Sequence, residues 1–486
     1  MQWLFLLVCV LAFSPDLPEG IISDPWLSAV GTGSLVAITS LAATLLGRMF
    51  GQDNAHGLSP SRFRCYRALR STLGTVIILN QVLALIVFDW GNVVRRHYAL
   101  GDWWLLDELC LISPLVIGLA SFWWGLYPAE KAWRQSPGLT DLESIWSRPG
   151  YVLFQMRVQL GLLLLPLLLY VGLQELGARM SATPLTPESG PGQWLLLTIS
   201  VVSALGTLGA MPWVLVRVWG TRSLPAGPVR QLLETTARRL GFRYTDFRVW
   251  HTRHNLANAM VTGILPWPRY IIFSDALLAE LSPDELVAVL GHEIGHIRRC
   301  HMPLYLLILL LASLSGGLLV RRFFPDWEVD LLWLTFRRPE TGAGWWHWLQ
   351  LLGLFAAVGG YVWLIFGFVS RRCECEADLY GCFAASCQDP NCSGEHSSTT
   401  FPADKPNRLC WGGIGAFIRA LKKIAQLNGI PNRQWSWRHG SIAQRIAYLE
   451  SLTQSAGKPL TLPRHTWIPQ WGVLGFLAAI SLILSL

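Results

Sequence analysis

A series of long apolar segments constrains the fold of this chain more than any other feature. Segments of about 20 apolar residues are long enough to cross the hydrocarbon core of a bilayer as helices. Of the 486 residues 52% are hydrophobic and 14% are charged, which does not describe a water-soluble protein of this size. We therefore predict a mainly α, multi-span helical membrane protein. The predicted spans are residues 29–46, 73–90, 109–126, 158–174, 194–216, 303–320, 346–369 and 469–486.

The first 13 residues, MQWLFLLVCVLAF, are also apolar. They lack the basic start of a normal secretory signal and are short for a transmembrane helix. Two interpretations stay open, a retained span and a cleaved leader.

Basic side chains are distributed unevenly between the loops that join the spans. Residues 217–301 contain eleven arginines and residues 370–468 contain twelve basic residues, whereas the charged residues among 14–28 are all acids. The positive-inside rule places the basic segments on the cytoplasmic side. The net charge of +8 thus follows membrane topology, and we predict no nucleic-acid partner. We expect a multi-pass protein of the inner, cytoplasmic membrane whose large polar segments face the cytoplasm.

Within the first of these segments, His292, Glu293 and His296 form a motif typical of a metal site. Two histidines four residues apart project from the same face of a helix, so both imidazoles can bind one zinc ion. Glu293 lies about 100° around the helix from His292. There its carboxylate can reach a metal-bound water and act as general base. The alternative is an ordinary amphipathic helix with two surface histidines.

The helix that this motif requires is predicted independently by its own start signals. Ser282 is a good N-cap, Pro283 suits the first helical position, and Glu285 stands where a capping box has its acid. After the motif, Pro303 interrupts the pattern.

A catalytic zinc needs a third protein ligand, which we expect on a helix that returns to the same side of the membrane. In SRRCECEADLYG, Glu374 and Asp378 are four residues apart and share a helix face, whereas Glu376 points almost the opposite way. We predict Glu374 as the third ligand and Asp378 as the side chain that orients an imidazole or the metal-bound carboxylate. Cys373 and Cys375 are rival ligands, and a charged helix at the membrane surface is the alternative.

The segment ahead of the metal helix predicts short strands in FRYTDFRVWHT and PRYIIFSD, separated by a polar, glycine-bearing turn region, HNLANAMVTGILPWP. A strand just ahead of the helix could pair with an extended peptide substrate through backbone hydrogen bonds. Asn258 in the turn region is either a substrate-binding residue or an ordinary turn residue. Near the end of the chain, His439 and Arg445 are candidates for donating hydrogen bonds to a reaction intermediate.

Six of the ten cysteines lie between residues 373 and 410. Their spacing matches no CxxC pair, so reduced loop thiols are the plain interpretation. A second metal site that includes His396 is the alternative.

Four motifs in order, NAMVTG, LSPDELVAVLGHEIGH, SRRCECEAD and RHGSIAQRI, resemble the integral-membrane zinc peptidases that include the type-1 CAAX prenyl protease and the bacterial heat-shock membrane protease. The resemblance implies a gluzincin-like α+β zinc peptidase domain in residues 217–468, interrupted by the spans 303–320 and 346–369. Residues 1–216 would form an N-terminal transmembrane region and residues 469–486 a C-terminal span.

The resemblance also implies roles for single residues. His292, His296 and Glu374 would bind one zinc ion, and Glu293 would be the general base. Asp378 would support the ligands, while the catalytic residues would include His439 and Arg445, which would bind substrate or stabilise the intermediate.

The predicted function is that of a zinc metalloendopeptidase that hydrolyses membrane-associated proteins or peptides at the cytoplasmic face, in quality control or processing. The alternative is a zinc-peptidase signal transducer of the β-lactam sensor type. Such sensors carry an extracellular ligand-binding domain, and nothing follows the last predicted span here, which disfavours this alternative. An intramembrane protease is disfavoured because the charged Asp284, Arg298 and Arg299 lie too close to the motif for lipid depth. An intact His, Glu and His set gives no reason to prefer a non-catalytic scaffold.

Overall fold

The structure is a computed structural model in which the chain forms two compact units. One unit comprises Met1–Trp219 with Leu332–Arg338, and the other comprises Gly220–Leu331 with Pro339–Leu486. The structure describes residues 20–52, 60–134, 146–180, 190–254, 256–323, 328–330, 335–337, 359–387 and 409–452, together with single residues near both ends and Gly353.

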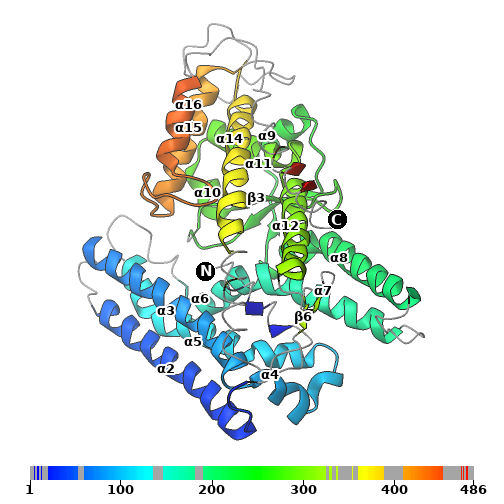
Figure 1. The fold of residues 1–486 in the computed structure, drawn as a ribbon. Coiled ribbons are helices and arrows are strands. Elements are labelled where there is room, and N and C mark those ends of the chain that lie inside the picture. Colours follow the sequence, from blue (N-terminus) through cyan, green and yellow to red (C-terminus); the bar gives the residue numbers. More distant parts are fainter. Residues whose placement is uncertain are drawn as a thin grey trace. The chain divides into compact units, whose positions relative to one another are not determined.

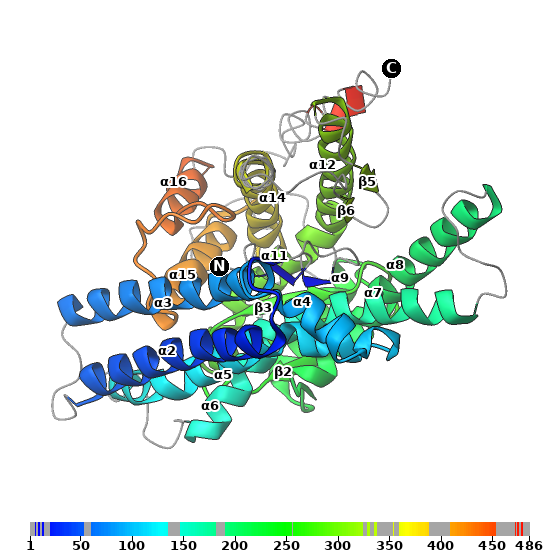
Figure 2. The same ribbon diagram turned by 60° about the horizontal axis from the view of Figure 1, so that its bottom comes forward.

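The first unit is built from long apolar helices. Helices α2, α3 and α5 pack side by side, and α7 packs along α8 (Figures 1 and 2). The elements of this unit are α2 (Pro25–Gly51), α3 (Pro60–Ile86), α4 (Trp90–Asn92), η1 (Val93–His97), η2 (Leu100–Asp102), α5 (Leu106–Arg134), α6 (Arg148–Gln155), η4 (Met156–Leu160), α7 (Gly161–Met180), α8 (Gly190–Val218) and β6 (Thr335–Arg337).

Five helical segments in the described residues are long and apolar enough to cross a membrane. They are Pro25–Gly51, Arg64–Ile86, Leu106–Trp133, Arg148–Met180 and Trp194–Val218. The first five predicted spans fall on these segments, except that the helix predicted to reach residue 90 ends at Ile86. The multi-pass membrane character of the chain is thereby confirmed.

The later predicted spans are described only in part. The span 303–320 lies within α12 (His301–Phe323). Half of 346–369 lies outside the described residues, as does most of 469–486 and most of the apolar stretch 1–13.

Two buried acids inside the first unit have partners of opposite charge. Glu130 accepts a hydrogen bond from the Tyr66 hydroxyl at 2.8 Å and pairs with Arg70. Asp107, in the first turn of α5, lies 2.9 Å from Arg95. Pairing offsets the cost of placing these charges in an apolar interior.

The second unit surrounds a small mixed sheet with helices. Its elements are β1 (Arg222–Ser223), α9 (Pro228–Arg239), β2 (Asp246–Trp250), β3 (Ala259–Thr262), β4 (Tyr270–Ser274), α10 (Asp275–Glu280), α11 (Pro283–Arg298), α12, β5 (Glu328–Asp330), η5 (Val362–Phe366), α14 (Gly367–Ala384), α15 (Trp411–Leu427) and α16 (Ile442–Leu452). A helical membrane chain with an α+β domain was predicted, and this fold class is confirmed.

The sheet has the strand order β1, β2, β4, β3. Strand β4 lies between β2, to which it is parallel, and β3, to which it is antiparallel. Its residues Ile271, Ile272 and Phe273 are buried, as expected for a central strand covered on both faces. In the described part of the chain nothing pairs with the outer side of β3, which is therefore an edge strand.

This topology corrects one interpretation of the sequence. The segment predicted as a turn region contains β3, and the strand just ahead of the metal helix, β4, has a partner on each side. The edge available to an extended peptide is β3. The error arose because β3 is only four residues long and its Ala259 and Met260 are partly exposed, which leaves little strand periodicity to recognise.

Helix α11 begins as its sequence predicts. The Glu285 carboxylate accepts a hydrogen bond from the Ser282 backbone N–H at 2.8 Å, and Pro283 occupies the first turn. Along the helix, Leu286, Leu290 and other apolar residues are buried in a core shared with the sheet. The helix is therefore fixed on its sheet side by apolar burial.

Helix α14 crosses α11 at very short range because glycines stand at the crossing. A Cβ added to Gly291 would lie 2.3 Å from the Ala384 Cβ, and one added to Gly295 would lie 2.9 Å from the Tyr380 Cβ. From the other side, a Cβ on Gly381 would lie 2.8 Å from the Ala288 carbonyl oxygen. The absence of side chains at these positions lets α14 bring its acids up to the histidines of α11.

The break after α11 falls earlier than the sequence suggested. Arg299 caps α11 and Cys300 adopts a positive φ of 55°, so α12 begins at His301 and contains Pro303 in its first turn. Proline is tolerated there because the first-turn N–H groups have no partner within the helix. The two helices are bent by 45°, and they would count as a sixth span if taken together. We treat α11 as part of the α+β unit because it packs on β3, α9, α14 and α15.

We predict that Gly291→Ala will lower the melting temperature of the protein in detergent. The new methyl group has no room at the crossing, and such overpacking costs about 1–3 kcal/mol. Gly209→Ala in α8 is the control, since a Cβ there meets nothing within 4 Å. Equal melting temperatures for the two variants would contradict a tight crossing.

Candidate metal centre

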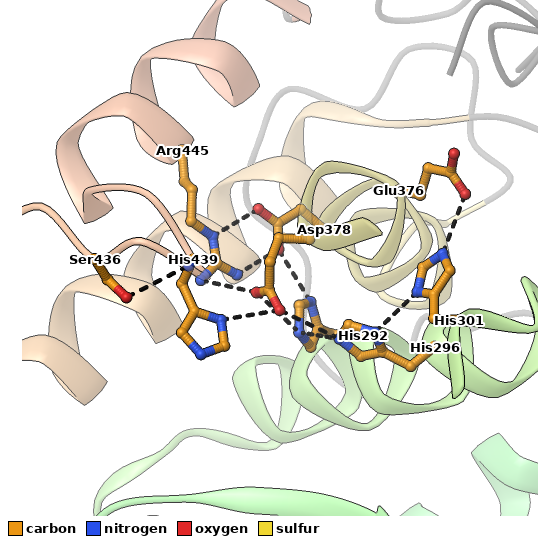
Figure 3. A network of polar contacts seen from close by, with 9 residues as sticks. His292, His296, His301, Glu376, Asp378, Ser436, His439 and Arg445 are labelled. Atoms are coloured by element: carbon orange, nitrogen blue, oxygen red, sulfur yellow. Dashed lines mark hydrogen bonds and ion pairs between the residues drawn. The ribbon is translucent and has the colours of Figure 1, made fainter. Parts of the chain in front are cut away.

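The structure brings together three side chains whose polar atoms could hold one ion. The Nε2 atoms of His292 and His296 lie 3.2 Å apart. The Glu374 carboxylate from α14 lies 3.9 Å from His292 Nε2 and 3.7 Å from His296 Nε2. Figure 3 shows the two imidazoles on one face of α11, directed towards α14.

These three residues fit a zinc ion by donor type and by spacing. Zinc bonds of about 2.0–2.2 Å in a tetrahedral site place ligand atoms roughly 3.3 Å apart. The candidate ligand atoms of His292, His296 and Glu374 all lie within 4.8 Å of one another. Cys373 and Cys375, the rival ligands, do not belong to this group among the described residues.

Asp378 contacts the imidazole of His292 on the side away from the candidate ion site. Its Oδ1 lies 3.0 Å from His292 Nδ1, the ring nitrogen that does not face the candidate ion site. The Phe417 ring stacks on the imidazole at 5.5 Å between centroids. Burial alone would lower the pKa of His292, but the hydrogen bond and negative charge of Asp378 outweigh it and raise the pKa. A carboxylate in this position fixes the ring and makes a better metal ligand of it.

Arg445 ties the two acids of α14 together. Its Nε and Nη2 lie 2.8 and 2.5 Å from the Asp378 carboxylate, and its Nη1 lies 3.4 Å from Glu374. Burial would raise the pKa of Asp378, but the charge of Arg445 holds it below its usual value. The guanidinium therefore supplies positive charge to both carboxylates inside a buried site.

His439 contacts the predicted third ligand from a loop. Its Nδ1 lies 2.9 Å from Glu374 Oε1, and its side chain is 47% exposed. Burial would raise the pKa of Glu374, but the His439 hydrogen bond and the Arg445 charge hold it well below the usual value. The other nitrogen of His439 points away from Glu374 (Figure 3).

For the other two motif residues, Glu293 and His296, burial is the largest cause of the pKa shift and sets its direction. Burial raises the pKa of Glu293 to about 7, although nearby His292 opposes the shift. Such a value suits a group that takes and returns a proton near neutral pH. Burial together with the neighbouring His292 lowers the pKa of His296 to about 3, so its imidazole is neutral, as metal binding requires.

Two buried residues of this network were not identified as functional from the sequence. His301 Nδ1 lies 2.9 Å from His296 Nδ1, and His301 Nε2 lies 3.2 Å from Glu376. Glu376 had been recognised only as pointing away from Glu374. A possible signal was a third histidine nine residues after His292, but its position depends on the helix break at Cys300.

Two other predictions can be placed in the structure. Asn258 immediately precedes β3 and is exposed. Its backbone N–H donates to the Ser274 hydroxyl, and its carbonyl accepts from the Ser274 backbone N–H. One backbone hydrogen bond thus continues from β4 to Asn258, and the role of this residue towards substrate stays a prediction.

Of the cysteine cluster, Cys410 accepts backbone hydrogen bonds from Cys387 and Gly413 at 3.3 Å. Cys392 and His396 lie outside the described residues, and the second metal site stays a prediction.

The fold and site define a class of membrane protein in which an α+β unit carries a candidate metal centre of two histidines and a carboxylate. Residues 223–453 match the model of peptidase family M48. The family predicted from the motifs is thereby confirmed.

Two named proteases are among the proteins to which the chain is similar. The protease HtpX of Pseudomonas aeruginosa strain LESB58 is 26% identical over 201 residues, which are 41% of this chain and 57% of HtpX. The CAAX prenyl protease 1 of Saccharomyces cerevisiae is 35% identical over 81 residues, which are 16% of this chain and 18% of the yeast protein. The chain thus spans little more than half the length of the HtpX relatives.

Among solved structures, Ste24p of S. mikatae is 16% identical and aligns with a TM-score of 0.49, covering 89% of this chain and 100% of Ste24p.

We predict that Arg445→Leu will markedly lower the melting temperature of the metal-free protein. Removing one partner of a buried ion pair leaves an uncompensated charge and costs about 3–5 kcal/mol. The control is Arg419→Leu, because Arg419 is 50% exposed where it pairs with Asp284, and exposed pairs contribute about 0–1 kcal/mol. A shift for Arg445→Leu no larger than that of the control would show that this pair does not hold the site together.

Proposed function

We propose that this protein is a membrane-embedded zinc metalloendopeptidase that cleaves membrane-associated proteins or peptides. The observation that carries the proposal is the convergence of His292, His296 and Glu374 on one point, with Glu293 beside them. The match to peptidase family M48 supports it. The comparisons do not favour the alternative of a β-lactam sensor.

Three residues would hold the ion and one would move protons. His292, His296 and Glu374 are the proposed ligands. Zinc, when bound there, would supply Lewis acidity towards the scissile carbonyl and the attacking water. Glu293 would accept the proton of the water as it attacks and pass a proton to the leaving amine. Its pKa of about 7 suits both transfers at neutral pH.

The free edge of β3 is the proposed binding site for the substrate backbone. An extended peptide can pair with an edge strand regardless of its side chains. Strand β3 packs against α11, the helix that carries Glu293 and the two histidines. The proposed position of the peptide is therefore beside the catalytic residues, with Asn258 at the start of the same strand.

His439 and Arg445 have different proposed parts. Arg445 is occupied by Asp378 and Glu374, so it would act by holding these carboxylates. His439 is half-exposed and directs one nitrogen away from Glu374, from where it would donate a hydrogen bond to the developing oxyanion (Figure 3).

For the whole chain, we propose that residues 1–216 and 469–486 anchor the peptidase domain, residues 217–468. The proposed location is the inner membrane, with the active site facing the cytoplasm, because basic residues concentrate in this domain. The substrates would be membrane proteins handled in quality control or processing.

We predict that Glu293→Gln will reduce peptide cleavage by about 10²–10⁴-fold, because the amide cannot accept the proton. Zinc content per chain, measured by mass spectrometry of purified protein, should equal that of the parent, since Glu293 is not a ligand. Cleavage at the parental rate would refute the assignment of the base. Proteins that accumulate with this variant in membranes would identify substrates.

We predict that Glu374→Ala will lower zinc occupancy, because it removes one of three protein ligands. The measurement is zinc content after dialysis against a weak chelator, with Glu280→Ala as an exposed glutamate control. Parental occupancy in Glu374→Ala would mean that another residue is the third ligand.

A further inference from the structure

We infer that His301 and Glu376 act as positioning residues that fix the orientation and tautomer of His296 as a metal ligand. The inference rests on the proposed metal site and adds two residues to it. In Figure 3 this pair lies on the side of the site away from His439 and Arg445.

The geometry is that of an unbroken polar chain. His296 Nδ1 lies 2.9 Å from His301 Nδ1, and His301 Nε2 lies 3.2 Å from Glu376 Oε2. The side chains of His301 and Glu376 are 1% and 2% exposed, so water does not compete for these contacts. The positive φ of Cys300 ends α11 and starts α12 at His301, which brings this imidazole back against His296.

Chemistry then sets the position of each proton. If His296 binds the ion through Nε2, its Nδ1 must carry a hydrogen and donate it. His301 Nδ1 must therefore be the acceptor, so the hydrogen of a neutral His301 sits on Nε2. That N–H points at the carboxylate of Glu376, which accepts it. One buried acid thus determines the tautomer of both histidines.

A buried acid also lies behind the other histidine of the motif. This repetition argues that the acids orient the two imidazoles. Asp378 lies 3.0 Å from Nδ1 of His292, the first histidine of the motif. Helix α14 thus supplies three acids. Glu374 faces the candidate ion site, Asp378 contacts His292 directly, and Glu376 reaches His296 through His301. A buried histidine and acid are costly compared with an apolar pair, so stability alone does not explain them.

The test is zinc affinity of the purified full-length protein in detergent, measured by competition with a chelator of known zinc affinity. Residues that orient metal-binding histidines typically change metal affinity about 10–100-fold. We expect His301→Leu and Glu376→Leu to weaken zinc binding by about this factor. His301→Gln should recover most of the affinity, because its amide offers one acceptor and one donor. His251→Leu, an exposed histidine, is the control and should bind as the parent does.

The melting temperature of each metal-free variant separates positioning from a merely structural role. Support for the inference is weakened zinc binding in the leucine variants with recovery in His301→Gln. Should the leucine variants not fold, Glu376→Gln decides whether the inference holds. Its amide oxygen is a neutral acceptor, so we expect zinc binding to weaken by about tenfold, which is less than the loss expected for leucine. Parental zinc affinity in Glu376→Gln would then overturn the inference.

Two results would overturn this inference but not the proposed metal site, provided that the parent binds one zinc. The first is parental zinc affinity in all variants. The second is equal weakening of zinc binding in His301→Gln and His301→Leu. If the parent itself binds no zinc, the proposed metal site fails as well.

Discussion

The close crossing of α11 and α14 is the constraint on which the candidate site depends. Neither helix carries all the candidate ligands, since His292 and His296 belong to α11 and Glu374 belongs to α14. The glycines at the crossing remove the side chains that would separate the helices. Apolar burial of α11 on the sheet and the contacts of α14 with α15 then hold the two helices in register.

Each ionisable side chain between α11 and α14 that is named below has a polar partner. Glu374 and Asp378 both pair with Arg445. The imidazole of His292 contacts Asp378, and that of His296 contacts His301. Buried ionisable groups are tolerated when each has a partner of matching character. The pKa of Glu374 is lowered and that of Glu293 is raised, because burial is outweighed by His439 and Arg445 at the first glutamate but not by His292 at the second.

Much of this arrangement could be predicted from the sequence because it rests on local signals. The capping residues of α11, the four-residue spacing of His292 and His296, and the shared helix face of Glu374 and Asp378 all follow from helix geometry. The edge strand β3 could not be predicted, since its four residues carry no clear alternation and its place at the edge is decided by pairing of distant segments. The contact of His301 with His296 could not be predicted either, because it depends on a backbone turn at Cys300.

The path of the chain into α14 has a mechanical consequence. Element η5 passes into α14 with Phe366 in helical conformation, so the described helix is continuous from Val362 to Ala384. Glu374, Glu376 and Asp378 lie on that single rod within two turns. A tilt or rotation of this helix would therefore displace all three acids together relative to the histidines of α11.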